Sequence, residues 1–137
     1  MAINQKIFGF LNKIVSIPAS KCNELGSSLI LPRSEQEDKD LFAALQSLGQ
    51  LNEFIALDGN DIANEGMWVD STGSKLNYFN WSAREPNNLE GRENHLHYWN
   101  QGTSRDGQWN DISGDNISSV VCSKTVVNGK FCKHDFR

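Results

Sequence analysis

One segment constrains the fold more than any other part of the chain. Over residues 58–94 the sequence is rich in Gly, Asn and Asp, yet aromatic residues recur within it. These aromatic residues are Trp68, Tyr78, Phe79 and Trp81. A loop this long inside a compact domain is normally either functional or disordered. Because aromatic side chains favour burial, we predict that the loop is ordered.

Regular elements are predicted before this loop. Ile7, Phe8 and Phe10 suggest an opening strand. Residues 16–25 suggest a short helix, with Pro18 in its first turn and Gly26 at its end. These elements would bring the chain to a second, longer helix.

The second helix is marked by its cap as well as by its apolar spacing. Ser34 and Glu37 form a capping box, and Gly49 suits the end of the helix. The apolar residues at helical spacing are Leu41, Leu45 and Leu48. After the loop, short strands are predicted at residues 95–99, 108–112 and 119–124. Two helices followed by short antiparallel strands indicate an α+β domain.

Size and charge exclude several classes of protein. The chain has 137 residues, which suits a single domain. Its net charge of −4 argues against a nucleic-acid partner, because such surfaces are usually basic. The sequence lacks a run of about 18 apolar residues, so we predict no membrane span. Met1 and Ala2 are followed by polar residues, unlike a signal peptide, which fits either a cytosolic chain or a mature secreted chain with an added methionine.

The side chains that carry chemistry are oxygen ligands in two short segments. The first holds Glu85-Pro86-Asn87 and Glu93, and the second holds Trp109-Asn110-Asp111. Calcium takes about 6–8 oxygen ligands from carboxylates, amide carbonyls and water. Glu85, Asn87, Glu93, Asn110 and Asp111 would supply most of that shell. None of them is His or Cys, so zinc fits poorly.

Each motif by itself has an ordinary structural explanation. Glu-Pro-Asn is a frequent turn sequence, and Trp-Asn-Asp is no more specific. Pro86 gains a further role in the calcium interpretation, because a cis bond before it would aim Glu85 and Asn87 at one point. His95 and His97 alternate along a predicted strand, and we interpret them as strand residues rather than as zinc ligands.

Together and in this order, the motifs resemble the C-type lectin carbohydrate-recognition domain. The resemblance covers most of the chain, from Gln5 to Lys124, and the opening Gln5-Lys6-Ile7-Phe8 looks most like collectins. Its further matching features are Cys22, Leu31-Pro32, Trp81 and Cys122. The resemblance implies the C-type lectin fold, with two helices, short antiparallel sheets and a long structured calcium-binding loop. It also implies a secreted protein, present here as a mature chain without its signal peptide.

The resemblance implies a role for each oxygen ligand. In the family, Glu85, Asn87, Glu93, Asn110 and Asp111 would hold the principal Ca²⁺ and also bind the sugar, whose vicinal hydroxyls coordinate the ion. The Glu-Pro-Asn order implies mannose, fucose, N-acetylglucosamine or glucose, and relatives that prefer galactose carry Gln-Pro-Asp. An auxiliary calcium site would map to Asp61, Glu65, Asn88 and Asn94, together with Glu93. Asn88 and Asn94 stand where many collectins have carboxylates, which weakens that site.

The three cysteines, Cys22, Cys122 and Cys132, leave one without an internal partner if a disulfide forms. The resemblance implies a Cys22–Cys122 disulfide, while His95 and Gly114 occupy the positions of the family's second bridge. We expect the lectin domain over residues 1–125 and a basic tail over residues 126–137. Cys132 in that tail either links two chains in a homodimer or remains a free thiol.

Two other classes of function are suggested by parts of the sequence. Glu85 and Glu93 could form the acid–base pair of a glycosidase, but calcium binding explains them better and the sequence has no established catalytic motif. We therefore expect no enzymatic activity. The alternative to sugar binding is a C-type lectin-like domain that binds a protein or another non-sugar ligand. Such relatives usually lack principal-site ligands, whereas this sequence has all five.

Overall fold

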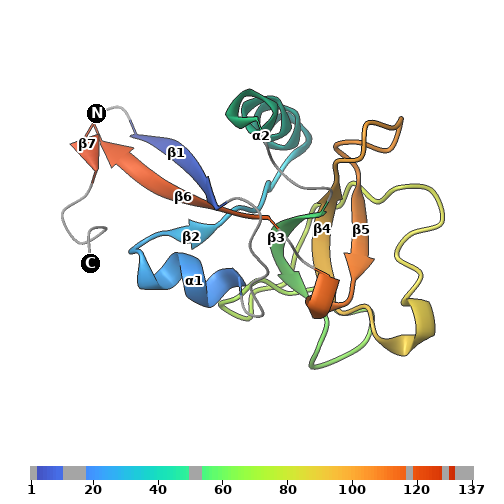
Figure 1. Ribbon diagram of the computed structural model, residues 1–137. Coiled ribbons are helices and arrows are strands. Elements are labelled where there is room, and N and C mark those ends of the chain that lie inside the picture. The colour runs from blue at the N-terminus through green and yellow to red at the C-terminus, as the bar shows by residue number, and fades with distance from the viewer. Residues whose placement is uncertain (1–2, 11–17, 50–53, 117–118, 128–129, 132–137) are drawn as a thin grey trace.

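The computed structural model describes residues 3–10, 18–49, 54–116, 119–127 and 130–131. Within these residues the chain forms two helices and two small antiparallel sheets (Figure 1). This arrangement confirms the predicted α+β class. In the described part of the chain, neither helix has the length and apolar character that crossing a bilayer requires.

The first sheet joins the two ends of the domain. Its strands are β1 (Ile3–Phe10), β6 (Val120–Val127) and β2 (Ser28–Leu29), in the order β1-β6-β2. A short β7 (Lys130–Phe131) pairs with the far end of β6. The predicted opening strand is therefore confirmed, and the last predicted strand continues beyond residue 124.

The second sheet carries half of the predicted site. Its order is β3 (Phe54–Asn60), β4 (His95–Trp99) and β5 (Trp109–Ile112). β4 and β5 lie where strands were predicted, but β3 was not predicted. Residues 55–57 of β3 are all buried, so the strand lacks the alternating pattern by which half-buried strands are recognised.

The two helices begin close to their predicted positions. They are α1 (Pro18–Glu24) and α2 (Glu35–Leu48), and Gly49 ends α2 with a φ of 65°. The Ser34 hydroxyl accepts the Glu37 N–H at 3.2 Å, as a capping box requires. The Glu37 carboxylate accepts the N–H of Arg33 at 2.7 Å instead of that of Ser34, so the reciprocal half of the predicted box is shifted by one residue.

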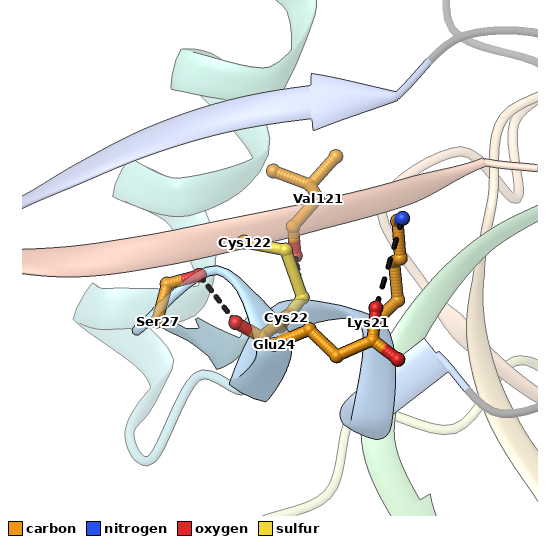
Figure 2. Close-up of a disulfide and its surroundings, with 6 residues drawn as sticks. All are labelled: Lys21, Cys22, Glu24, Ser27, Val121 and Cys122. Atoms are coloured by element: carbon orange, nitrogen blue, oxygen red, sulfur yellow. Dashed lines mark hydrogen bonds and ion pairs between the residues drawn. A yellow bond between two sulfur atoms is a disulfide. The ribbon is translucent and has the colours of Figure 1, made fainter. Parts of the chain in front are cut away.

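A disulfide between Cys22 and Cys122 ties α1 to β6 (Figure 2). The two cysteines are 100 residues apart and fully buried. The Ser27 hydroxyl donates to the Cys22 carbonyl oxygen at 2.8 Å and fixes the turn that follows α1. The pairing confirms the disulfide that the family resemblance implied. Cys132, for which both an intermolecular link and a free thiol were left open, lies outside the described residues.

Asp38 of α2 is a buried residue whose carboxylate accepts hydrogen bonds from four side chains of the loop and the second sheet. Its Oδ2 accepts Tyr78 Oη and Asn80 Nδ2, both at 2.8 Å. Its Oδ1 accepts Tyr98 Oη in a short bond and Trp109 Nε1 at 3.4 Å. Asp38 therefore links helix α2, the long loop and strands β4 and β5 at one point.

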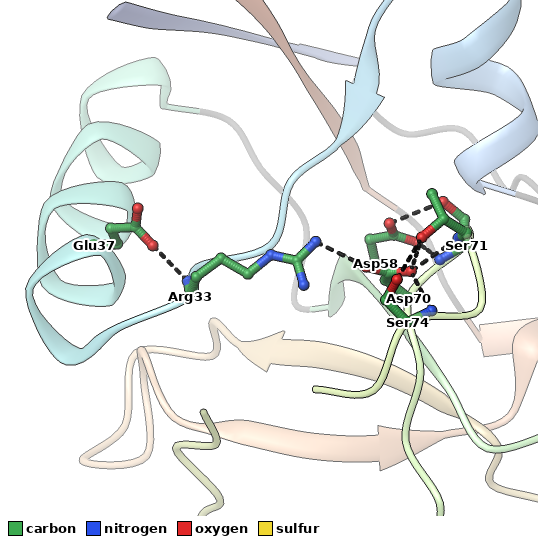
Figure 3. A network of polar contacts seen from close by, with 7 residues as sticks. Arg33, Glu37, Asp58, Asp70, Ser71 and Ser74 are labelled. Atoms are coloured by element: carbon green, nitrogen blue, oxygen red, sulfur yellow. Dashed lines mark hydrogen bonds and ion pairs between the residues drawn. The ribbon is translucent and has the colours of Figure 1, made fainter. Parts of the chain in front are cut away.

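The long loop is ordered, as predicted, and polar contacts hold its first half (Figure 3). The Arg33 guanidinium lies 2.9 Å from the Asp70 carboxylate, which also accepts the N–H of Ser74. Ser71 donates to Asp58 through both its N–H and its hydroxyl. Burial raises the pKa of Asp70, but hydrogen bonds from Thr72, Arg33 and the backbone outweigh it and lower that pKa to about 2.

Candidate functional site

The second half of the loop is held against β5, and this places the two predicted ligand segments side by side. Trp81 and Trp109 form a parallel bridge. The Trp109 N–H donates to the Asn80 carbonyl, and the Ser82 N–H donates to the Trp109 carbonyl, each at 2.8 Å. Glu85 follows Ser82 closely, so it begins the ligand loop next to the strand that carries Asn110 and Asp111.

Residues 84–91 have a compact backbone. The Glu85–Pro86 peptide is cis, in agreement with the sequence interpretation. Arg84, Asn88 and Glu90 have positive φ angles of 72°, 46° and 56°, which are uncommon for residues other than glycine. Asn88 precedes a short 3-10 turn, η1 (Leu89–Gly91). The N–H of Gly91 donates to the Asn88 carbonyl at 2.8 Å and closes this turn.

Asp111 fixes the loop to β5 from the strand side. Its carboxylate is fully buried and accepts the N–H of Asn87 at 3.1 Å and that of Asn88 at 2.7 Å. Glu93 closes the loop from its other end, because its carboxylate accepts the Leu89 N–H at 3.0 Å and its N–H donates to Asn88 Oδ1 at 3.2 Å. The structure therefore links Asn87, Asn88, Glu93 and Asp111 through one set of hydrogen bonds.

Four buried side-chain oxygens in or next to this loop lack a hydrogen-bond partner among the described residues. They are Glu85 Oε1, Asn110 Oδ1, Asp61 Oδ1 and Ser82 Oγ. A buried acceptor without a partner costs about 1–3 kcal/mol. All except Ser82 Oγ belong to the predicted ligand sets, and an oxygen-binding cation is the kind of group that would satisfy them.

The carboxylates of the site also repel one another. Burial raises the pKa of Glu85 to about 7, and the negative charges of Asp111 and Glu93 contribute to the rise. Burial likewise raises the pKa of Glu93, although its bond from the Leu89 N–H opposes the shift. Clustered carboxylates with raised pKa values are typical of a site that binds a cation.

The arrangement does not by itself form a complete metal centre. Among the described residues, no group of three or more His, Cys, Asp and Glu side chains could hold a metal ion. Two of the five predicted ligands are asparagines, and Asp111 is turned toward two backbone N–H groups. The principal ligand set therefore remains a prediction.

The predicted auxiliary ligands lie around Asp61. This aspartate is buried, and its Oδ2 accepts the Gly66 N–H at 2.9 Å. The Asp61 N–H donates to the Asn94 carbonyl at 3.2 Å, so both segments of the auxiliary set meet there. Glu65 is exposed, and its pKa is raised by desolvation, by Asp61 and by the charge of Asp111. The auxiliary and principal sets are thus electrostatic neighbours, and the auxiliary site also remains a prediction.

Two hollows of the surface differ in their relation to the site. A hollow of about 250 Å³ is lined by Glu93 and its neighbours Leu89, Glu90 and Arg92, and by Ser113, Asp115 and Asn116. A larger cleft of about 430 Å³ lies by the Arg33–Asp70 contact and contains none of the predicted ligands. Only the smaller hollow adjoins a predicted ligand, so the candidate site is delimited by the ligands and not by cleft size.

The two histidines lie on β4, as predicted, but one of them touches the site. His97 is fully buried, and its Nε2 lies 3.0 Å from Asn110 Nδ2. His95 packs against Gly114, where an added Cβ would lie 2.9 Å from His95 Nε2. The sequence interpretation missed the contact of His97 with Asn110. The signal was present in the pairing of β4 with β5, whose register could not be fixed from sequence alone.

Comparisons with known proteins agree with this fold and these motifs. Collectin-43 of Bos taurus is 35% identical over 126 residues, covering 88% of this chain and 37% of the relative. Pulmonary surfactant-associated protein D of Sus scrofa is 31% identical over 125 residues, covering 88% and 31%. The chain thus spans about a third of the length of these relatives. The solved mouse scavenger receptor C-type lectin carbohydrate-recognition domain superposes with a TM-score of 0.72 at 26% identity, covering 88% of this chain and 87% of that chain.

The family assignment rests on a match that covers most of the chain. The Lectin C-type domain matches residues 13–124, which include both helices and all five predicted principal ligands. The family is not enzymatic, which agrees with the expectation drawn from the motifs. The chain belongs to the C-type lectin family, as a carbohydrate-recognition domain related to those of the collectins.

Proposed function

We propose that this domain binds Ca²⁺ and, through it, a mannose-type sugar. The observation that carries the proposal is the pair of buried oxygens, Glu85 Oε1 and Asn110 Oδ1, that lack donors among the described residues. Both belong to the ligand set that the family resemblance implies. Bound calcium would supply a centre with open coordination positions for two sugar hydroxyls.

The principal ligands would have different hydrogen-bonding roles toward the sugar. The carboxylates of Glu85 and Glu93 would accept hydrogen bonds from the hydroxyls, and the amides of Asn87 and Asn110 would donate to them. Bonds to charged groups are about twice as strong as neutral ones. The Glu-Pro-Asn order favours the equatorial diol of mannose, fucose, N-acetylglucosamine or glucose over galactose.

Electrostatics support the presence of a cation here. Glu85 has a pKa raised to about 7 because it is buried beside Asp111 and Glu93. A divalent cation at this point would favour the ionised carboxylates and lower that pKa. An auxiliary ion would be held by Asp61, Glu65, Asn88 and Asn94, together with Glu93. Because two of these ligands are neutral amides, the set carries less negative charge than one made only of carboxylates.

The family also suggests a proposal for the organisation of this chain. We infer secretion, with the lectin domain over residues 1–125 and a basic tail over residues 126–137. Cys132 would link two chains. Single sites for sugar bind weakly, and pairing them raises avidity without any new contact.

The proposal is tested by affinity chromatography on mannose-agarose. We expect retention in millimolar calcium and elution by a chelator or by free mannose, but not by free galactose. Replacing Glu85→Gln together with Asn87→Asp should shift retention to galactose-agarose. Glu90→Gln is the matched control, since Glu90 lies exposed in the same loop and pairs with Arg92 outside the ligand set.

The outcomes separate the proposed function from its alternative. Calcium binding measured by titration without retention on any sugar would indicate a C-type lectin-like domain with a protein or other non-sugar ligand. Retention that survives the chelator would place the sugar elsewhere on the molecule.

A further inference from the structure

His97 and Asn110 face each other across two paired strands. They are direct partners in the antiparallel register of β4 and β5. The imidazole is fully buried, with the Phe54 ring edge-on at 5.2 Å and the Trp99 ring at 5.3 Å from its centroid. Close packing against these two rings restricts the orientation of the imidazole.

The protonation of this ring follows from its partners. Nδ1 lies 2.7 Å from the Tyr98 carbonyl oxygen, which can only accept, so Nδ1 carries the proton. The ring is fully buried and its described contacts are with a carbonyl, an amide and aromatic rings, so its uncharged form is favoured. A neutral ring with its proton on Nδ1 has a bare Nε2, and this nitrogen can only accept.

The bare nitrogen dictates how the Asn110 amide is turned. Nε2 lies 3.0 Å from the amide, so an N–H of Nδ2 must face it. The opposite orientation would set Oδ1 against the Nε2 lone pair. Asn110 Oδ1 is therefore turned away from the ring, where it is buried without a donor among the described residues.

We infer that His97 is a positioning residue that presents Asn110 Oδ1 to the calcium ion and keeps the second N–H of Nδ2 for the sugar. The inference rests on the proposed function and assigns a role to a residue outside the ligand set. A flipped amide would turn its N–H groups toward the cation and lose the bond to the ring. Residues that orient metal ligands typically change metal affinity by 10–100-fold when they are replaced.

The experiment compares two substitutions by calorimetric calcium titration. His97→Phe keeps a ring but removes the acceptor, and we expect its calcium affinity to fall about tenfold or more. His97→Gln keeps an acceptor for Asn110 and a donor for Tyr98, and we expect affinity within about threefold of the unmodified protein. His95→Gln, on the same strand but packed against Gly114, is the matched control and should keep its affinity.

A second measurement reads the hydrogen bond in calcium-free protein. Nitrogen-15 spectra should show Nδ1 of His97 protonated and Nε2 bare, with a scalar coupling between Nε2 and Asn110 Nδ2. This readout does not depend on calcium binding or on the folding of any variant. A protonated Nε2, or equal calcium affinities for His97→Phe and the unmodified protein, would overturn the role of His97. Absence of calcium affinity in the unmodified protein, with the coupling present, would overturn the proposed function instead.

Discussion

Replacing Asp38 by asparagine should destabilise the domain more than its single-atom change suggests. The carboxylate is 3% exposed and accepts from Tyr78, Asn80, Tyr98 and Trp109. The pKa values of Tyr78 and Tyr98 are raised by burial and by Asp38, so both hydroxyls remain protonated donors. An asparagine has one acceptor oxygen and therefore cannot serve both pairs of donors.

The size of the effect follows from which donor loses its acceptor. If the new NH₂ replaces Oδ2 of Asp38, it meets Asn80 Nδ2; if it replaces Oδ1, it meets Trp109 Nε1. The tyrosine hydroxyls can reverse and accept, but these two nitrogens cannot. One donor–donor contact and the loss of charge from the remaining bonds cost about 2–4 kcal/mol. For a domain of this size, that range corresponds to a fall in melting temperature of about 8–16 °C.

The measurement is thermal and urea unfolding by circular dichroism, with chelator present so that calcium does not add to the stability. Asp40→Asn is the control: Asp40 lies exposed on the same helix and accepts only from Gln36 among the contacts described for it. Its change should stay within about 0.5 kcal/mol. Equal or greater stability for Asp38→Asn would refute the reasoning. It would show that the free-energy cost of burying the charge exceeds the stabilisation from its four hydrogen bonds.

Three further predictions concern calcium, glycosylation and pH. Calcium at 100 times its dissociation constant should stabilise the fold by about 2.7 kcal/mol, seen as a rise in melting temperature that magnesium does not reproduce; a rise below about 1 °C would contradict the proposed site. Asn80 begins a glycosylation sequon, but its Nδ2 donates to Asp38 and to the Gly107 carbonyl at 2.8 and 3.0 Å. Peptide mass spectrometry of folded, secreted protein should therefore find no glycan there, and an occupied Asn80 would contradict this. The pKa of Asp70 is lowered from 3.8 to about 2, so its contribution to stability is complete above pH 3.8 and is lost as the pH falls through 2. Asp70→Asn should lower stability at pH 7 and flatten the acid side of the pH–stability curve, whereas a curve parallel to that of the unmodified protein would exclude this role.

Much of the fold could be predicted because its signals are local. The Ser34 cap, the spaced leucines and Gly49 define α2 within a single stretch of chain. Strands β4 and β5 were found for the same reason. β3 was missed because its buried run, Ile55 to Leu57, has no polar alternation and its partners come from β4 and from Ser119. Periodicity cannot report a strand that is buried on both faces.

The site could be predicted only as a set of residue types. Glu85, Asn87 and Asp111 suggest oxygen coordination wherever they occur together, and the family resemblance supplies their grouping. The contacts that orient them depend on register. His97 meets Asn110 because β4 and β5 pair with those residues opposite, and a shift of one residue would place a leucine or a tyrosine there.

Asp38 was missed for a different reason. In the sequence it is one more acidic residue in the first turns of a helix, where acids are favourable at the N-terminus. Its burial depends on aromatic and amide donors that come from residues 78–80 and from two strands. No local pattern distinguishes it from the exposed Asp40 on the same helix.

The hydrogen bonds of Asp111 order the loop that carries three of the proposed ligands. Each carboxylate oxygen has about two lone-pair positions, and the N–H groups of Asn87 and Asn88 use one on each oxygen. These two bonds fix the loop against β5, and the Glu85 carboxyl lies beside the same carboxylate. Glu85 and Asn110 differ from Asp111, because each has a buried oxygen that accepts no hydrogen bond from the described residues. Under the proposed function, ion binding would satisfy these two oxygens beside a loop that the Asp111 bonds already fix to β5.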